Sequence, residues 1–217
     1  MNRVYNPGCA LLIYKPVYMD RIISFLCKDL YTVQAHNICC RHNPTLPNGS
    51  LIINTCAGCD KRFSTLYTGI TTVSLWEILA ASDTFPFPKY DGITMTIHDP
   101  CPIRTKKNVH DSIRIILKKM DIKVIETNNN KKNSICCGDS FYPELPIDEI
   151  HSKMKERADS MPCQDVCVYC VSCIKSIHIG GKNPRYILDL LFSEPTETQV
   201  FDTIEWHNML QKFIDAH

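Results

Sequence analysis

The sequence places two adjacent cysteines directly before a glycine, at Cys136-Cys137-Gly138, with Cys101 upstream and Cys170-x-x-Cys173 downstream. Adjacent cysteines do not readily bond to each other, because a disulfide requires their Cβ atoms to turn together at a larger Cα separation. Both can instead face one metal centre, and the glycine allows the backbone to fold closely around it. Five cysteines in this order therefore indicate a thiolate metal site.

The same order of cysteines occurs earlier in the chain. Cys9 precedes an amphipathic helix pattern, Cys39-Cys40 lies in a polar loop, and Cys56-x-x-Cys59 follows an apolar strand pattern. In this first set, 29 residues separate Cys9 from Cys39 and 15 separate Cys40 from Cys56, against 34 and 32 at the corresponding places in the second set. We interpret the repeat as a duplication with a shortened first copy.

Apolar patterns predict strands at residues 51–53, 93–97, 124–125 and 165–169. Apolar residues at helical spacing predict helices over 19–30, 72–82, 109–120, 150–161, 186–192 and 200–214, the last with Phe201, Ile204, Leu210 and Phe213 facing inward. Strands that alternate with helices indicate an α/β fold with mostly parallel strands. We expect two domains, residues 1–88 and 89–217, divided after Phe85-Pro86-Phe87-Pro88.

Composition narrows the classes of function. The chain has 217 residues, of which 44% are hydrophobic and 22% charged, and its formal net charge is +1. The charges are well mixed and form no basic stripe, so we do not expect nucleic acid as a partner. The apolar runs are too short for a membrane span or a secretion signal, so we expect a reducing cytoplasm. There, thirteen cysteines are metal ligands or redox groups rather than disulfides.

The chemistry of sulfur favours iron–sulfur clusters but leaves zinc open. Thiolates are soft donors that suit both. A structural zinc ion takes four tetrahedral ligands, so five cysteines per set are one too many, whereas a cluster has several irons and accepts sulfurs from separate loops. The spacing of Cys163, Cys167 and Cys170 matches the radical S-adenosylmethionine signature, but that fold needs a large barrel downstream and only 47 residues follow. We expect Cys27 and Cys167 to be core residues and leave Cys163 unassigned.

The cysteine pattern resembles the cysteine-rich CCG-domain family, of the heterodisulfide-reductase-B type. The resemblance covers nearly the whole chain. It rests on the following segments: Gly8-Cys9, Cys39-Cys40, Cys56-Ala57-Gly58-Cys59, His98-Asp99-Pro100-Cys101, Cys136-Cys137-Gly138 and Cys170-Val171-Ser172-Cys173. The first set departs from the family pattern, because Arg41 rather than glycine follows Cys40.

This resemblance implies two pseudo-symmetric, Rossmann-like halves with metal sites at the cleft between them. It implies one or two noncubane [4Fe-4S] clusters, with zinc as an alternative at the N-terminal set. One cluster would use Cys101, Cys136, Cys137, Cys170 and Cys173, and the other Cys9, Cys39, Cys40, Cys56 and Cys59. Electrons would come from an iron–sulfur or flavin partner protein, since no flavin or nucleotide fingerprint is present, and would pass to a disulfide or similar acceptor.

Two further functions remain open: a zinc-stabilised interaction protein without redox activity, and an electron-transfer subunit without disulfide chemistry. The sequence leaves open whether the chain is itself an enzyme. His98 is a weak catalytic candidate, as a proton donor to a leaving thiolate. The favoured interpretation is that His98 ends a strand and bonds locally, while Asp99-Pro100 shapes the turn into Cys101.

Overall fold

The computed structural model describes residues 2–30, 32–198 and 202–216, which form two compact units. Unit 1 comprises Met1–Phe85 and His207–His217, and unit 2 comprises Pro86–Trp206. The division expected from the sequence, after residue 88, lies three residues further along the chain, and residues 207–217 group with unit 1 rather than with the second half.

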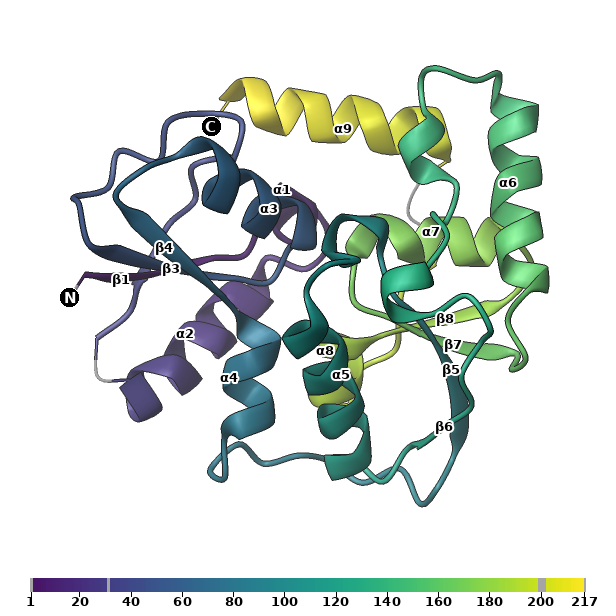
Figure 1. The fold of residues 1–217 in the computed structure, drawn as a ribbon, viewed down its shortest axis with the longest axis horizontal. Helices are drawn as coiled ribbons and strands as arrows, with labels where there is room; N and C mark the ends of the chain where they lie inside the picture. The colour runs from purple at the N-terminus through teal and green to yellow at the C-terminus, as the bar shows by residue number, and fades with distance from the viewer. Residues whose placement is uncertain (1, 31, 199–201, 217) are drawn as a thin grey trace. The chain divides into compact units, whose positions relative to one another are not determined.

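Unit 1 is built on a four-stranded sheet in which every strand pair is parallel, in the order β2-β1-β3-β4. The strands are β1 (Arg3–Asn6), β2 (Gln34–Ala35), β3 (Ser50–Asn54) and β4 (Ile70–Ser74). The helices are α1 (Cys9–Tyr14), α2 (Val17–Leu30), α3 (Ala57–Leu66) and α4 (Leu75–Ala81). Figure 1 shows α2 and α4 on one face of the sheet and α3 on the other.

Unit 2 repeats this arrangement with the order β6-β5-β7-β8, again with parallel pairs throughout. Its strands are β5 (Thr94–His98), β6 (Lys123–Val124), β7 (Asp165–Val168) and β8 (Asn183–Tyr186). Its helices are α5 (Lys107–Lys119), α6 (Ile147–Asp159), α7 (Val171–Ile179) and α8 (Ile187–Leu191), with short 3₁₀ turns η1 (Cys101–Ile103), η2 (Lys131–Asn133) and η3 (Asp139–Phe141). The last helix, α9 (Thr203–Ala216), begins in unit 2 and continues into unit 1.

The two sheets share one topology, which confirms the prediction of two Rossmann-like α/β halves with parallel strands. In unit 1 the fully described loop 36–49, between β2 and β3, contains no helix. In unit 2 the corresponding connection contains η3 and α6. The shorter spacing between Cys40 and Cys56 therefore has a structural counterpart, namely a helix that only the second copy contains.

Strand β5, in the middle of the unit 2 sheet, is covered on both faces. Residues Met95, Thr96, Ile97 and His98 of β5 are all fully buried, so the polar members of the alternating pattern also face helices. This is typical of a parallel sheet with helices on both sides. Ile93 was predicted to belong to this strand from the alternation of apolar and polar residues. It instead precedes β5 and is exposed.

Several local predictions were wrong. Residues 72–82 do not form one helix: 70–74 form β4, and the helix begins only at Leu75. The β-branched run Ile70-Thr71-Thr72-Val73 favours a strand, and Ser74 then caps α4 in a capping box with Glu77. In α9, Ile204 is 48% exposed, and the residues buried there are Thr203 and Trp206. Phe201 lies outside the described residues.

Candidate metal centres

In unit 1, the five cysteines of the first set lie in the loops and helix starts that follow the carboxyl ends of the strands. Cys9 is the first residue of α1, with two residues between it and the end of β1, and Cys56 is the N-cap of α3 after β3. Gly8 has φ +79, and a Cβ there would lie 2.8 Å from the Cβ of Cys56. Only glycine permits this approach, which brings the two loops together.

The thiols of the first set form one connected group. Cys9 and Cys40 hydrogen-bond to Cys39, and Cys59 hydrogen-bonds to both Cys40 and Cys56. Hydrogen bonds from Cys40 and Cys9 hold the pKa of Cys39 far below that of an ordinary thiol. The hydrogen bond with Cys59 likewise lowers the pKa of Cys56 to about 7. All five predicted residues are thus brought together, with Cys39 favoured as the thiolate.

The second set repeats these contacts position by position within unit 2. Cys101 and Cys137 hydrogen-bond to Cys136, and Cys173 contacts both Cys137, at 3.4 Å between sulfurs, and Cys170. Hydrogen bonds from Cys101 and Cys137 lower the pKa of Cys136 strongly. All five residues predicted for this set also come together.

The Cys136-Cys137-Gly138 loop is held against two helices. Gly138 has φ +107, and a Cβ there would lie 2.6 Å from Cγ and 3.0 Å from the backbone nitrogen of Met154 in α6. Its N–H donates to Cys136 Sγ at 3.4 Å. On the other side, Lys175 of α7 pairs with Asp139 at 2.7 Å. The close approach that the glycine was expected to permit is therefore an approach to α6.

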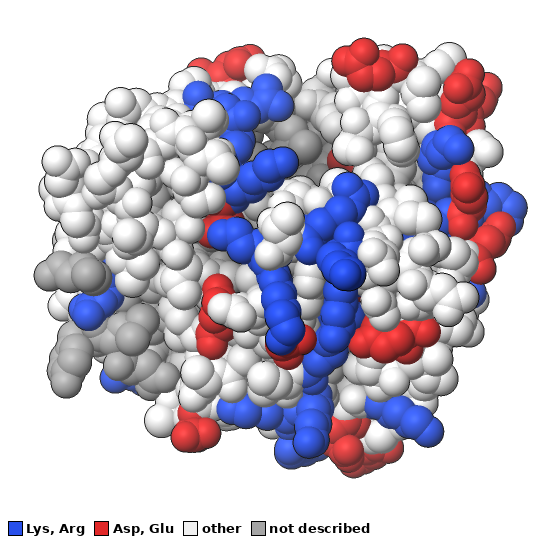
Figure 2. Space-filling view, in the orientation of Figure 1, with Lys and Arg blue, Asp and Glu red and all other residues white. Residues whose placement is uncertain are grey.

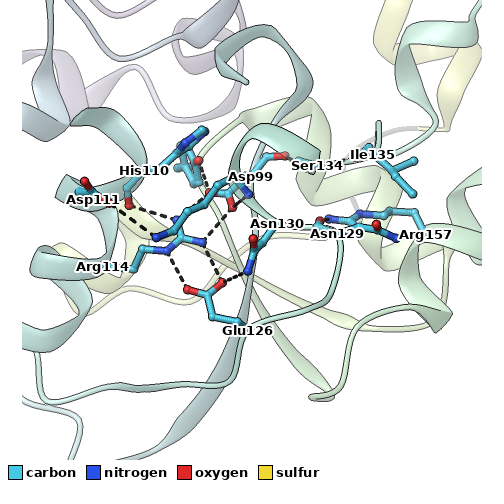
Figure 3. Close-up of polar contacts among 12 residues, drawn as sticks. Asp99, His110, Asp111, Arg114, Glu126, Asn129, Asn130, Ser134, Ile135 and Arg157 are labelled. Atoms are coloured by element: carbon cyan, nitrogen blue, oxygen red, sulfur yellow. Dashed lines mark hydrogen bonds and ion pairs between the residues drawn. The ribbon is translucent and has the colours of Figure 1, made fainter. Parts of the chain in front are cut away.

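Asp99 anchors the loops that carry Cys101 and Cys136, as Figure 3 shows for its polar neighbours. Its two carboxylate oxygens accept from both terminal nitrogens of Arg114, at 2.8 and 2.9 Å, and from the backbone N–H of Lys131 and the hydroxyl of Tyr169. Its carbonyl accepts from the hydroxyl of Ser134. Burial is the largest single influence and would raise the pKa of Asp99, but Arg114, together with the hydrogen bonds from Tyr169 and Lys131, outweighs it and lowers the pKa. Asp99 does more than the simple turn predicted for it.

His98 bonds to a distant residue, so the expectation of a local hydrogen bond was wrong. The Nε–H of Arg157, in α6, donates to His98 Nδ1 at 3.2 Å. His98 Nε2 is buried without a hydrogen-bond partner among the described residues. A ring nitrogen of His98 and the sulfurs of Cys137 and Cys173 all lie within 4.8 Å of one another. Burial, and then the charge of Arg157, lower the pKa of His98 to about 3.

Arg114 and Arg157 belong to this site but were not predicted. Each had a signal in the sequence, because each sits at helical spacing among apolar residues. Arg157 falls between Met154 and Ala158 on the buried face of α6. An arginine on a buried face needs partners there.

The remaining cysteines lie outside both groups. Cys167 is fully buried in β7, as predicted, and burial raises its pKa to about 12. Cys27 is half-buried, and its thiol contacts the carbonyl of Val33 at 3.6 Å. The backbone N–H of Cys163 donates to the hydroxyl of Thr96. Neither Cys163 nor Cys167 hydrogen-bonds to the thiols described above, which gives the radical S-adenosylmethionine spacing no support.

Comparison with known proteins gives no family assignment: no protein-family model and no curated protein matches this sequence. Among the described residues, no helix is both long and apolar enough to cross a membrane.

Figure 2 shows Lys and Arg side chains gathered over the region of α5, with Asp and Glu side chains among and beside them. Of the α5 charges, Lys107 pairs with Asp111, and Arg114 pairs with Asp99 and Glu126.

Proposed function

We propose that the chain is an iron–sulfur oxidoreductase subunit of the heterodisulfide-reductase-B-like kind. It would hold one noncubane [4Fe-4S] cluster in each five-cysteine set. One observation carries the proposal: two groups of five thiols, on loops of the same topology, with matching contacts. Five thiols exceed what one tetrahedral zinc ion takes, and clusters accept sulfurs from several loops.

Two buried nitrogen groups support a negatively charged, sulfur-rich occupant at the second set. Arg157 is 2% exposed, and its three hydrogen bonds go to His98 Nδ1, Ser160 Oγ and the carbonyl of Asn129, all neutral acceptors. A buried guanidinium without a carboxylate is costly unless other negative charge lies nearby. Burial lowers the pKa of Arg157. Four acidic groups act in the opposite direction and raise it: Asp99, Cys173, Cys137 and Cys136.

The hydrogen bond from Arg157 also decides how His98 can act. Because Arg157 donates to Nδ1, a neutral His98 carries its proton on Nε2. That N–H is then a donor for sulfur and cannot at the same time be a metal ligand. The group of His98, Cys137 and Cys173 is the one observation that favours a zinc site, and this tautomer argues against it.

A bound cluster would supply one-electron transfer, with a potential set by nearby hydrogen bonds and charge. The chain's own residues would do the rest. The five thiolates would bind iron, and Asp99 and Gly138 would hold the loops. His98 would donate toward sulfur, and Arg157 would orient His98 and offset the negative charge. We infer a cytoplasmic protein that receives electrons from an iron–sulfur or flavin partner and passes them to a disulfide or similar acceptor.

A pair of matched variants tests this assignment. Cys101→Ala removes one thiol of the second set, and Cys167→Ala removes a buried cysteine outside both sets. In protein prepared without oxygen, we expect Cys101→Ala to lose about half of the iron, since one of two four-iron centres is affected. Cys167→Ala should keep wild-type iron. Equal iron in the two variants would contradict the ligand assignment.

A further inference from the structure

Unit 2 contains a cavity of about 260 Å³ beside the second set of thiols. The side chains that matter for its chemistry come from the loop before Cys136, from η3 and from one face of α6. They are Ile135, Cys136, Phe141, Lys153, Glu156 and Arg157. Cys136 is the one member of either five-cysteine set that lines it. The cavity therefore gives access to the edge of the proposed centre.

The inner wall carries positive charge with spare hydrogen-bond capacity. Arg157 has five N–H donors, and its contacts with described residues account for three of them. The two that remain are on Nη1 and Nη2, which already hold its buried partners Ser160 and Asn129. An anion that reached this guanidinium would satisfy both donors in a site where water screens the charge weakly.

Lys153 adds a second cation, one turn before Arg157 on α6. Its side chain is 49% exposed and pairs at 3.1 Å with Glu156, whose side chain is 72% exposed, so both charges lie toward solvent. Arg157, at 2% exposed, is the buried charge of the lining. The lining thus has two cations and one carboxylate, and this excess of positive charge favours an anionic group on Arg157 with Lys153 nearby.

The other wall is apolar. Ile135 is 48% exposed, next to Cys136 in sequence, and Phe141 follows from η3. Apolar side chains with a few convergent polar groups are typical of small-molecule sites, and the volume, just below their usual range, suits a small ligand.

We propose that this cavity binds a small carboxylic acid with a short apolar body. The carboxylate lies on Arg157 and Lys153, and the apolar body packs on Ile135 and Phe141, next to Cys136. Binding follows from the cavity alone. Its use as the entry of the electron acceptor rests on the proposed function, and it then makes the acceptor a small acidic molecule rather than a protein.

Calorimetric titration with pentanoate and with pentanamide, its neutral analogue, tests the site. We expect pentanoate to bind about tenfold more tightly than pentanamide, because only the acid forms charge-assisted hydrogen bonds. Lys153→Gln should weaken pentanoate binding about fivefold and leave pentanamide unchanged. The control is Lys155→Gln, on the same helix, where Lys155 pairs with Asp159 and does not line the cavity. Arg157→Lys, which keeps a charge at the buried position, should also weaken binding.

Three results would overturn the site: equal affinity for acid and amide, no binding of either at about 10 mM, or equal weakening by Lys153→Gln and Lys155→Gln. The metal content and visible spectrum of each sample keep this outcome separate from the proposed function. Pentanoate binding to protein without iron would support the cavity and reject the cluster. A loaded centre without pentanoate binding would reject the cavity alone.

Discussion

At the scale of single residues, Asp99 joins several distant segments of unit 2 through hydrogen bonds to its carboxylate. Its carboxylate is completely buried and holds Arg114, Tyr169 and the backbone of Lys131 together. The sequence showed only an Asp-Pro pair before a cysteine, which is typical of a turn. The partners of Asp99 lie 15, 32 and 70 residues away, so no local pattern could have revealed them.

Removing the cation of this pair should be costly. Arg114→Met leaves the Asp99 carboxylate buried without its main partner, and we expect a loss of about 3–5 kcal/mol in the free energy of unfolding. Lys107→Met, on the same helix, breaks an exposed pair with Asp111 in which the lysine side chain is 84% exposed. That change should cost less than about 1 kcal/mol. Urea denaturation of both variants measures the difference, and similar losses would show that the buried network contributes little.

At the scale of elements, the cysteine loops were predictable and some of their neighbours were not. The CxxC segments follow strands as expected, because a buried apolar run followed by a turn is a strong local signal. Each also begins a helix, α3 or α7. The strands β1, β2, β4 and β8 were missed, because they are short or were merged with adjoining patterns. Their pairing is set by parallel neighbours distant in sequence.

Gly138 provides a test of how tightly the cysteine loop is packed. Gly138→Ala would place a Cβ at φ +107 and against α6, so we expect the strain of a positive φ, about 1–2 kcal/mol, and about 1–3 kcal/mol more from overpacking. Gly181 has φ +92 but nothing within 4 Å of its Cβ position, so Gly181→Ala should show the strain alone. Thermal unfolding compares the two. If Gly181→Ala destabilises the protein as much as Gly138→Ala does, the contact with Met154 adds no cost of its own.

At the scale of the whole molecule, the repeated cysteine order anticipated the repeated fold. Ten cysteines, five in the same order in each half, predicted two equivalent halves, and both sheets have the same strand order. The spacing difference corresponds to η3 and α6, which only unit 2 contains. That helix brings Arg157 to His98 and lines the cavity at Cys136, so the added length of the second copy accounts for the features that distinguish its site.

The most direct test of the central claim is the iron, zinc and acid-labile sulfide content of protein purified without oxygen, with paramagnetic-resonance spectra of its oxidised and reduced states. We predict about eight irons per chain with a matching amount of sulfide, from two four-iron centres. About four irons would restrict the proposal to one set. Zinc without iron or sulfide would contradict the redox function and leave the thiols as structural ligands.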